Sequence, residues 1–374
     1  MNIKIIKLLD ACLGRALTTM LSPTPESAVP EPVKTILIIR PGGIGDAVLL
    51  SPAILSIKKK YPSVHITVLG GKRNAGAFSL IQCVDRILRY DLPKEIITVF
   101  QNSYDVVIDT EQWHRLSAVV ARLVQAPLKI GFNTNERRRM FTHTIPYSQD
   151  DYETTNFANL MAPLYIDSAN IMVNEPFLSI PDDSKKYAEI LLASLQGKTF
   201  ITLFPGASIP ERRWGKERFQ KVAELLSIIG VAIVVVGGKE DQLQGEVIVS
   251  NCSGLNLAGL TSLAETAAVI SQSALLVSGD SGVLHIAVGL GVPTVSLFGP
   301  GRAKKWAPRG AHHIVINKEL PCSPCTTFGT TPPCPINARC MQEISVDEVV
   351  NAVKKLLSSM GAIPVVPSDE NNTG

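Results

Sequence analysis

Residues 275–300 read LLVSGDSGVLHIAVGLGVPTVSLFGP and predict one complete βαβ unit. Two short apolar runs, 274–277 and 294–298, have the composition of buried strands. Between them, small residues from 283 to about 290 predict a helix, which a Gly-Val-Pro sequence ends. Strand, turn, helix and strand in this order are typical of a parallel sheet.

The turn between the first strand and the helix, residues 278–282, is the first candidate site. In open α/β sheets, ligands bind beyond the carboxyl ends of the strands, where this turn lies. Its free amides and the start of the helix suit a phosphate or another anion. The alternative is a purely structural turn in which Asp280 or Ser281 caps the helix.

Length and composition limit the class of protein. A chain of 374 residues is long enough for two domains, and 45% hydrophobic with 18% charged residues indicates a globular protein. The formal net charge of +3 does not favour general nucleic-acid binding. No apolar run is long enough to span a bilayer, and no secretory signal is evident, so we expect a cytoplasmic protein.

The chain is expected to have five segments. These are an amphipathic helix (1–21), a proline-rich linker (22–32), an N-terminal Rossmann-like domain (33–180), a C-terminal Rossmann-like domain (181–360) and a disordered tail (361–374). The first helix carries basic residues among its apolar ones, which favours contact with an anionic membrane surface. The alternative is a helix packed against the protein's own flank.

The N-terminal domain opens with a buried strand at 35–39, a glycine-rich turn ending at Asp46, and a helix predicted over 47–60. The turn lacks the dinucleotide-binding pattern, and Gly-Gly-Lys-Arg at 70–73 replaces the acidic residue that a ribose would require. A nicotinamide-dependent oxidoreductase is therefore disfavoured. Asp46 lies at the carboxyl end of the predicted strand, where a ligand could approach its carboxylate. Alternatively, Asp46 only caps the helix that follows.

Two loops of the C-terminal domain also follow predicted strands. Residues 205–214 supply a glycine, the Ser208 hydroxyl and two arginines, which suit a diphosphate. After the next strand, Glu240 and Asp241 could hold the hydroxyls of a ribose or cap a helix.

Three motifs together carry a family resemblance. The sequences at 38–53 (I-x-R-P-G-G-I-G-D-A-V-L-L-S-P-A), 204–214 (F-P-G-A-S-x-x-x-R-R-W) and 279–300 resemble glycosyltransferase family 9, the ADP-heptose:lipopolysaccharide heptosyltransferases and their relatives. The resemblance covers roughly 33–357. It implies the GT-B class of α/β fold, with two Rossmann-like domains whose parallel sheets face each other across a cleft.

The resemblance also implies an activity and its partners. It indicates inverting transfer of a heptose or related sugar from a nucleotide-diphosphate donor, such as ADP-heptose, without a required metal or cofactor. The acceptor would be the lipopolysaccharide core or another anionic, lipid-linked glycan, which suits a peripheral enzyme at the cytoplasmic face of the inner membrane.

Site residues follow from the matched motifs. Asp46 resembles the general base that takes the proton of the acceptor hydroxyl. The expected donor-binding residues are Ser208, Arg212, Glu240, Asp280, Ser281, Gly282 and His285. Because the acceptor is anionic, the expected acceptor contacts are Gly43, Lys72, Arg73, Arg137, Arg138 and Arg139. For the arginine run, a solvated loop is the alternative.

Four of the seven cysteines gather in one loop, at Cys322, Cys325, Cys334 and Cys340. Their spacing is compatible with a structural zinc, with two disulfides or with four reduced thiols. A cytoplasmic location disfavours the disulfides.

Two other functions remain open from the sequence. A nucleotide-sugar epimerase or hydrolase of the same fold would need a further acid or base in the cleft, and none is clear. A non-catalytic sugar-nucleotide-binding protein would have no use for Asp46.

Overall fold

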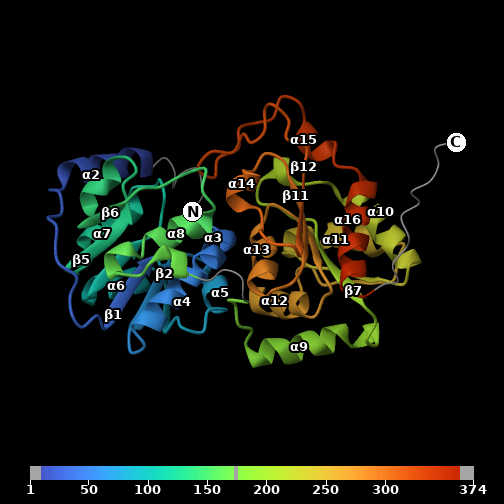
Figure 1. Cartoon of the computed structure of the whole chain (residues 1–374), viewed down its shortest axis with the longest axis horizontal. Helices are drawn as coiled ribbons and strands as arrows, with labels where there is room; N and C mark the ends of the chain where they lie inside the picture. The colour runs from blue at the N-terminus through green and yellow to red at the C-terminus, as the bar shows by residue number, and fades with distance from the viewer. Residues whose placement is uncertain (1–9, 172–175, 363–374) are drawn as a thin grey trace. The chain divides into compact units, whose positions relative to one another are not determined.

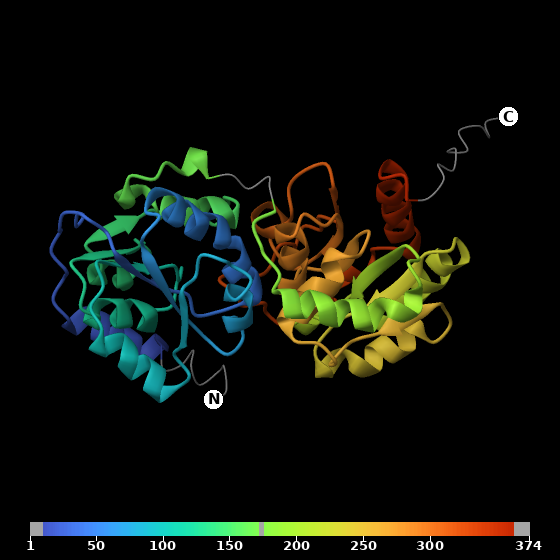
Figure 2. The ribbon, with the colours of Figure 1, turned by 90° about the horizontal axis from the view of Figure 1, so that it is seen from below.

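The computed structural model describes residues 10–171 and 176–362, and the chain divides into two compact units. The first unit comprises Met1–Pro181 with two later segments, Lys304–Trp306 and Thr327–Thr330. The second comprises Asp182–Ala303, Ala307–Thr326 and Thr331–Gly374. Each unit has a parallel six-stranded sheet with helices on both faces (Figures 1 and 2).

The sheet of the first unit has the strand order β3-β2-β1-β4-β5-β6. Its strands are β1 (Thr35–Ile39), β2 (His65–Gly70), β3 (Arg86–Arg89), β4 (Val106–Asp109), β5 (Leu128–Phe132) and β6 (His143–Ile145). The central strands β1 and β4 are buried on both faces, and apart from Thr35 and Asp109 at their ends they are apolar, as is typical of a parallel sheet between two helix layers. The order reverses between β1 and β4, which is where sheets of this kind bind ligands.

The helices of the first unit are short. They are η1 (Asp10–Gly14), α2 (Arg15–Met20), α3 (Ile44–Leu49), α4 (Ser51–Lys60), α5 (Ala75–Phe78), α6 (Pro93–Gln101), α7 (Leu116–Leu123), η2 (Glu136–Met140), α8 (Glu153–Asn159), η3 (Ala162–Leu164) and η4 (Ser168–Asn170). On one face of the sheet, α6 and α7 bury a core with side chains of β1, β2 and β4. Helices α3 and α4 both contact α8.

The sheet of the second unit repeats this design with the order β12-β11-β10-β7-β8-β9. Its strands are β7 (Phe200–Phe204), β8 (Ala232–Val235), β9 (Gly254–Asn256), β10 (Leu276–Gly279), β11 (Thr294–Phe298) and β12 (His313–Asn317). The predicted βαβ unit is thus β10, α13 and β11, with Leu276 opposite Thr294 in the parallel register. The order reverses between β7 and β10.

The second unit also has helices of several lengths. They are α9 (Asp182–Leu192), η5 (Ala193–Leu195), η6 (Pro210–Arg212), α10 (Lys216–Ile228), η7 (Lys239–Asp241), α11 (Gln242–Val249), α12 (Leu263–Ser271), α13 (Gly282–Gly289), α14 (Ala303–Trp306), α15 (Arg339–Gln342) and α16 (Val346–Ser359). Helices α10 and α16 pack side by side and bury one large core against the sheet.

The helix predicted over 47–60 differs from the structure. Two helices, α3 and α4, meet at Leu50 instead. Pro52 explains the break, because proline has no amide hydrogen for a helical bond and its ring crowds the preceding turn. The first helix also begins earlier, at Ile44, so that Asp46 lies in its first turn.

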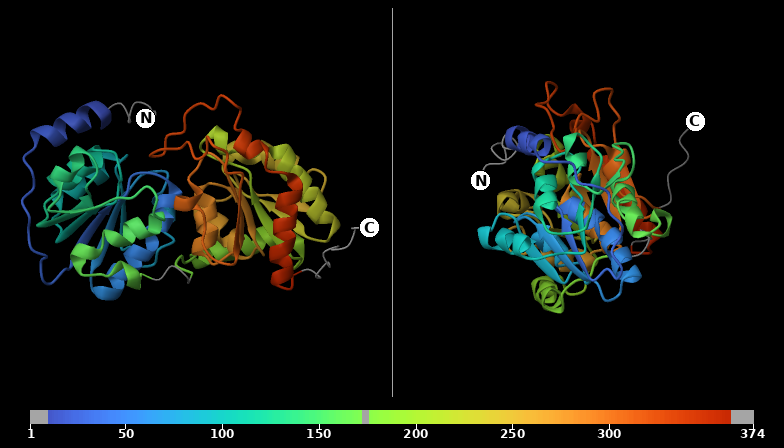
Figure 3. Two further views of the ribbon diagram at one scale, coloured as in Figure 1. Left: turned by 45° about the horizontal axis from the view of Figure 1, so that its top comes forward. Right: turned by 90° about the vertical axis from the view of Figure 1, so that its left-hand side faces the viewer.

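The N-terminal segment packs against the flank of the first unit. Residues 10–20 lie along α7 and η2 (Figure 3). Buried Asp10 fixes this position: its Oδ1 accepts the amides of Arg115 and Leu116 at the start of α7, each at 2.8 Å. Burial raises the pKa of Asp10, but the bonds from His114 and these amides outweigh it and hold the pKa below its usual value.

Among residues 10–171 and 176–362, no helix combines the length and apolar character needed to cross a bilayer. The first nine residues of the predicted amphipathic helix lie outside the described residues, as does the predicted tail from 363 onward.

Substitution Asp10→Ala is expected to lower the free energy of unfolding by about 1–2 kcal/mol, because two helix-start amides lose their acceptor. Asp10→Asn keeps an acceptor oxygen and should lose less. The measurement is urea denaturation, with Thr19→Ala on the exposed side of α2 as control. Equal stability of Asp10→Ala and the wild type would contradict the capping role.

Candidate functional site

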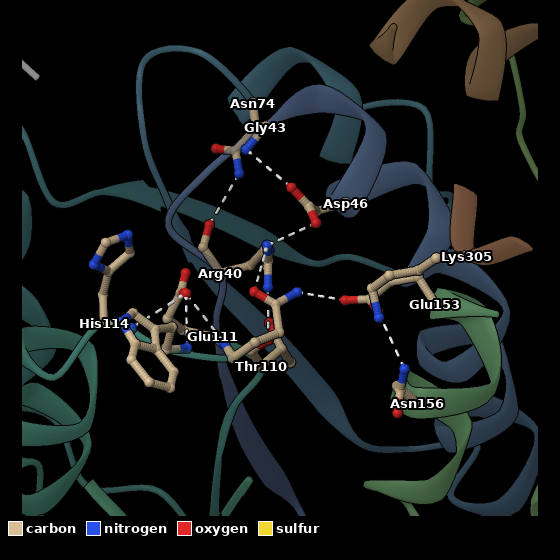
Figure 4. Close-up of polar contacts among 12 residues, drawn as sticks. Arg40, Gly43, Asp46, Asn74, Thr110, Glu111, His114, Glu153, Asn156 and Lys305 are labelled. Atoms are coloured by element: carbon tan, nitrogen blue, oxygen red, sulfur yellow. Dashed lines mark hydrogen bonds and ion pairs between the residues drawn. The ribbon is translucent and has the colours of Figure 1, made fainter. Parts of the chain in front are cut away.

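The candidate residues of the first unit follow β1 and β4, on either side of the point where the strand order reverses. Asp46 lies in the first turn of α3 (Figure 4). Its Oδ2 accepts the amide of Gly43 at 3.3 Å, so it caps its helix, and its Oδ1 pairs with Arg40 Nη2 at 2.9 Å. The side chain is still 20% exposed. Each carboxylate oxygen has two lone pairs, so Asp46 can also accept a hydrogen bond from a ligand hydroxyl.

Arg40 holds Asp46 from the interior. Its guanidinium is almost fully buried, and Nη1 donates to the carbonyl of Thr110 at 2.6 Å, beyond the end of β4. Burial lowers the pKa of Arg40, but the carboxylates of Asp46, Glu111 and Glu153 outweigh it and raise the pKa above its usual value. Arg40 therefore stays a cation that ties the loop after β1 to the loop after β4.

A second carboxyl group, that of fully buried Glu153 at the start of α8, lies beside this pair (Figure 4). Lys305, in the Lys304–Trp306 segment of the first unit, approaches its Oε2 to 2.6 Å. Tyr147 and Asn156 donate to the same oxygen at 3.2 Å, and Gln112 donates to Oε1. Burial raises the pKa of Glu153, while Lys305 opposes that rise.

Gln112 joins the two carboxylates into one network. Its side chain accepts from Arg40 at 3.4 Å and donates to Glu153. Arg40, Glu153 and Lys305 were not among the sequence predictions. Arg40 could have been found, because an arginine directly after a buried apolar strand needs a partner. Glu153 and Lys305 carry no comparable local signal.

The basic residues predicted as acceptor contacts differ in exposure. Arg137 is fully buried and pairs with equally buried Asp109 at 2.7 Å. This burial disfavours the predicted contact of Arg137 with an acceptor, because its guanidinium is paired with Asp109 inside the unit. Lys72, Arg73 and Arg138 are exposed.

Arg139 is half-buried, and its guanidinium donates to the carbonyl of Leu21 at 3.4 Å. It therefore helps to hold the N-terminal segment in place.

In the second unit, the predicted residues follow β7, β8 and β10, which are adjacent strands. Arg212 Nη1 pairs with Asp280 Oδ2 at 2.8 Å, joining the loop after β7 to the turn after β10. Asp280 is buried, and a Cβ at Gly301 would lie only 2.1 Å from its Oδ2, so only glycine fits there.

Ser281 caps α13: its Oγ accepts the amide of Leu284 at 3.2 Å. It also shares a hydrogen bond of 2.8 Å with the hydroxyl of Ser278. Gly282 is the first residue of α13, and His285 is buried one turn further along.

Two further predicted residues of this unit, Ser208 and Glu240, are exposed. The neighbouring Asp241 is buried, and its Oδ2 accepts the amide of Gly238 at 3.0 Å. Of the two carboxylates after β8, Asp241 therefore shapes the loop, while Glu240 faces solvent.

The four clustered cysteines are free thiols whose side chains line one small cavity. Burial raises the pKa of Cys325 and of Cys340, and neighbouring thiols add to the effect. Among the described residues, no three His, Cys, Asp or Glu side chains are arranged to hold a metal ion, so a structural zinc finds no support.

Comparison with known proteins gives three consistent results. A family model described as glycosyltransferase family 9 (heptosyltransferase) matches residues 96–334. A lipopolysaccharide heptosyltransferase 3 from Escherichia coli is 27% identical, over 84% of this chain and 97% of its own length. A lipooligosaccharide heptosyltransferase 2 from Campylobacter jejuni is 24% identical, over 86% of this chain and 98% of its own.

Among solved structures, the ADP-heptose lipopolysaccharide heptosyltransferase II of E. coli superposes with a TM-score of 0.72. The match has 20% sequence identity and covers 87% of this chain and 99% of that one. The GT-B class of fold expected from the sequence motifs is confirmed.

Replacing Lys305 tests how much the ion pair with buried Glu153 contributes to the free energy of unfolding. Lys305→Met is expected to lower the free energy of unfolding by about 3–5 kcal/mol at neutral pH, because Glu153 loses its cation. Since burial raises the pKa of Glu153, the loss should be smallest below about pH 4.3, where the carboxyl is protonated in both states, and should grow as the pH rises.

The measurement for Lys305→Met is urea denaturation across this pH range. Exposed Lys304→Met is the matched control, and the double variant Lys305→Met/Glu153→Gln should recover much of the loss. A loss that does not depend on pH would argue against an unpaired Glu153 as its cause.

Proposed function

Because the chain belongs to glycosyltransferase family 9 and is therefore a glycosyltransferase, we propose that it transfers a heptose from ADP-heptose to the core of lipopolysaccharide. The two relatives described above are named as heptosyltransferases, and the match to this chain covers nearly their whole length. The observation that carries the proposal is the partly exposed Asp46 carboxylate, held at the reversal of the strand order by a buried arginine.

In the proposed reaction, Asp46 accepts the proton of the acceptor hydroxyl as that oxygen attacks the anomeric carbon of the donor sugar. The new glycosidic bond forms on the face opposite the breaking bond, so the configuration inverts, and the nucleoside diphosphate leaves with the bonding electron pair. A general base contributes when it lies within hydrogen-bond reach of the hydroxyl. The 20% exposure of Asp46 is compatible with such an approach.

We assign the leaving diphosphate to the second unit. The guanidinium of Arg212, the hydroxyl of Ser208 and the amides at the start of α13, from Ser281 and Gly282, would stabilise its negative charge. Asp280 orients Arg212 through their ion pair. The carboxylate of exposed Glu240 would accept hydrogen bonds from the ribose hydroxyls. Buried His285 would support the turn from within α13. The proposal includes no resident metal or cofactor.

On the acceptor side, we propose that exposed Lys72, Arg73 and Arg138 attract anionic groups of the core. Gly43 acts on this side through its amide, which donates to Asp46 and holds that carboxylate in place. The acceptor is lipid-linked, so we further propose that the enzyme works at the cytoplasmic face of the inner membrane. The half-exposed Leu13 and the exposed Met20 of the N-terminal segment would touch the bilayer surface there.

The substitution Asp46→Asn tests the base. It should lower kcat by about 10²–10⁴-fold, because an amide cannot take the proton, while ADP should bind as tightly as to the wild type. Calorimetric titration with ADP, UDP and GDP, and radiolabelled transfer to a series of lipopolysaccharides with truncated cores, measure the two effects. Preference for UDP or GDP would overturn the donor, and unchanged kcat would overturn the base.

These measurements also separate the alternatives. An epimerase or hydrolase would consume the nucleotide sugar without an acceptor. A sugar-nucleotide-binding protein would bind ADP-heptose with no turnover in either case.

Arg40 is expected to act as a positioning residue. Arg40→Lys keeps a positive charge but cannot reach Asp46 and the Thr110 carbonyl in the same geometry, so kcat should fall about tenfold or more. The KM for the donor and the Kd for ADP should not change. Exposed Arg86→Lys, in β3 of the same unit, is the matched control. An equal loss in kcat and in ADP affinity would indicate general disruption instead.

A further inference from the structure

An aromatic pair lies on the surface of the first unit, outside the residues assigned so far. The side chain of Trp113 is 38% exposed, and its ring stacks on that of Phe328 at 4.2 Å between centroids and 23° between planes. Phe328 also stacks on Tyr147, at 6.4 Å and 27°. Trp113 thus keeps over a third of its surface in water although one of its neighbours is another aromatic ring.

The backbone around Trp113 is held rigidly. Buried Glu111 accepts the amides of Gln112, Trp113 and His114 through Oε1, at 3.1, 3.2 and 3.4 Å. The carbonyl of Trp113 accepts from Asn135 Nδ2 at 2.9 Å. The indole is therefore presented from a fixed turn.

The backbone of Phe328 is also constrained. This residue lies in the loop that carries the four clustered cysteines, residues 322–340 (the cysteine loop). Its φ of 44° lies in the left-handed region, which is costly for a phenylalanine. The flanking residues Thr327 and Thr330 pair amide to carbonyl in both directions at 2.9 Å. Below them, the hydroxyls of Thr326 and Thr331 share a hydrogen bond of 2.7 Å. These hydrogen bonds constrain the loop that carries the Phe328 ring, which stacks on Trp113.

The pair lies at the same edge of the sheet as Asp46. Trp113 comes four residues after the end of β4, and β4 is hydrogen-bonded to β1, whose following turn carries Asp46. Arg40 ties the two loops together, through Asp46 and the Thr110 carbonyl. Burial and the charges of Glu153 and Asp46 raise the pKa of Tyr147, which places the third ring within electrostatic range of Asp46.

We propose that Trp113, backed by Phe328, is a stacking platform for a sugar ring of the acceptor glycan. The axial C–H groups of a sugar ring form an apolar, slightly positive face, which packs on the electron-rich face of an indole. The inference rests on the proposed function, since an acceptor hydroxyl must reach Asp46 and its sugar must then lie over this edge of the sheet. In this proposal, the cysteine loop serves to position Phe328 against Trp113.

Kinetics with saturating ADP-heptose and the best O-deacylated, core-truncated lipopolysaccharide as acceptor test the platform. Trp113→Ala should raise the acceptor KM about tenfold or more, as lost aromatic stacking typically does. The donor KM and the Kd for ADP should stay unchanged. Trp113→Phe keeps a flat ring and should recover much of the loss.

A double-variant cycle tests the backing role. If Phe328 acts through Trp113, then Phe328→Ala should raise the acceptor KM in the wild type and change it little in the Trp113→Ala background. Phe100→Ala is the matched control, because Phe100 is 42% exposed in α6 and lies in the same unit. It should leave the acceptor KM unchanged.

Binding without turnover separates this inference from the proposed function. The chain has three tryptophans, so titration with the same acceptor should change the emission of the wild type and not that of Trp113→Phe. If no heptose is transferred but this signal is present, the platform stands and the proposed reaction falls. An unchanged acceptor KM in Trp113→Ala, equal changes in donor and acceptor KM, or an acceptor signal that persists in Trp113→Phe would each overturn the platform.

Discussion

The ion pair between buried Arg40 and partly exposed Asp46 is the constraint on which the first unit depends. An arginine out of water costs several kcal/mol unless its charge is matched and its donors are used. The match comes from a carboxylate in the first turn of α3, and a further bond goes to a carbonyl beyond β4. The loops after β1 and β4 are thereby held in one arrangement, at the reversal of the strand order.

Buried Glu153, which lies beside that pair, also needs a group of opposite charge, and Lys305 provides it. Two carboxylates and two cations thus share one buried region, linked by Gln112. Among them, only Asp46 keeps appreciable contact with water, at 20% exposure. Within this network, Asp46 is thus the charged group that solvent can reach, and Arg40 holds its position.

The two units share one sheet topology, but at the point where the strand order reverses they carry side chains of opposite charge. At its reversal point, the first unit presents a carboxylate and, nearby, an exposed aromatic surface. The second presents Arg212 and the start of α13, with Asp280 buried as the anchor of the arginine. A carboxylate suits a hydroxyl that must lose a proton, and a cation with helix amides suits an anion that must leave.

Much of this could be predicted from local patterns. Apolar runs bounded by glycine-rich turns located the strands, and the turns placed Asp46, Ser208 and Asp280 at strand ends. Sequence could not distinguish Arg137 from Arg138, although one is fully buried and the other exposed. Adjacent residues in a short helical turn point in different directions, and their burial depends on a distant partner, here Asp109.

The two parallel sheets and the order of their elements can be predicted from the amino-acid sequence, because hydrophobic periodicity and turn chemistry act over a few neighbouring residues. The family follows separately, from the resemblance of three motifs. Tertiary structure alone decided the partners of the buried charges and the meeting of Trp113 with Phe328. Those residues come from distant parts of the chain. Their contacts follow from which loops the folded sheet brings together, and no local pattern records that geometry.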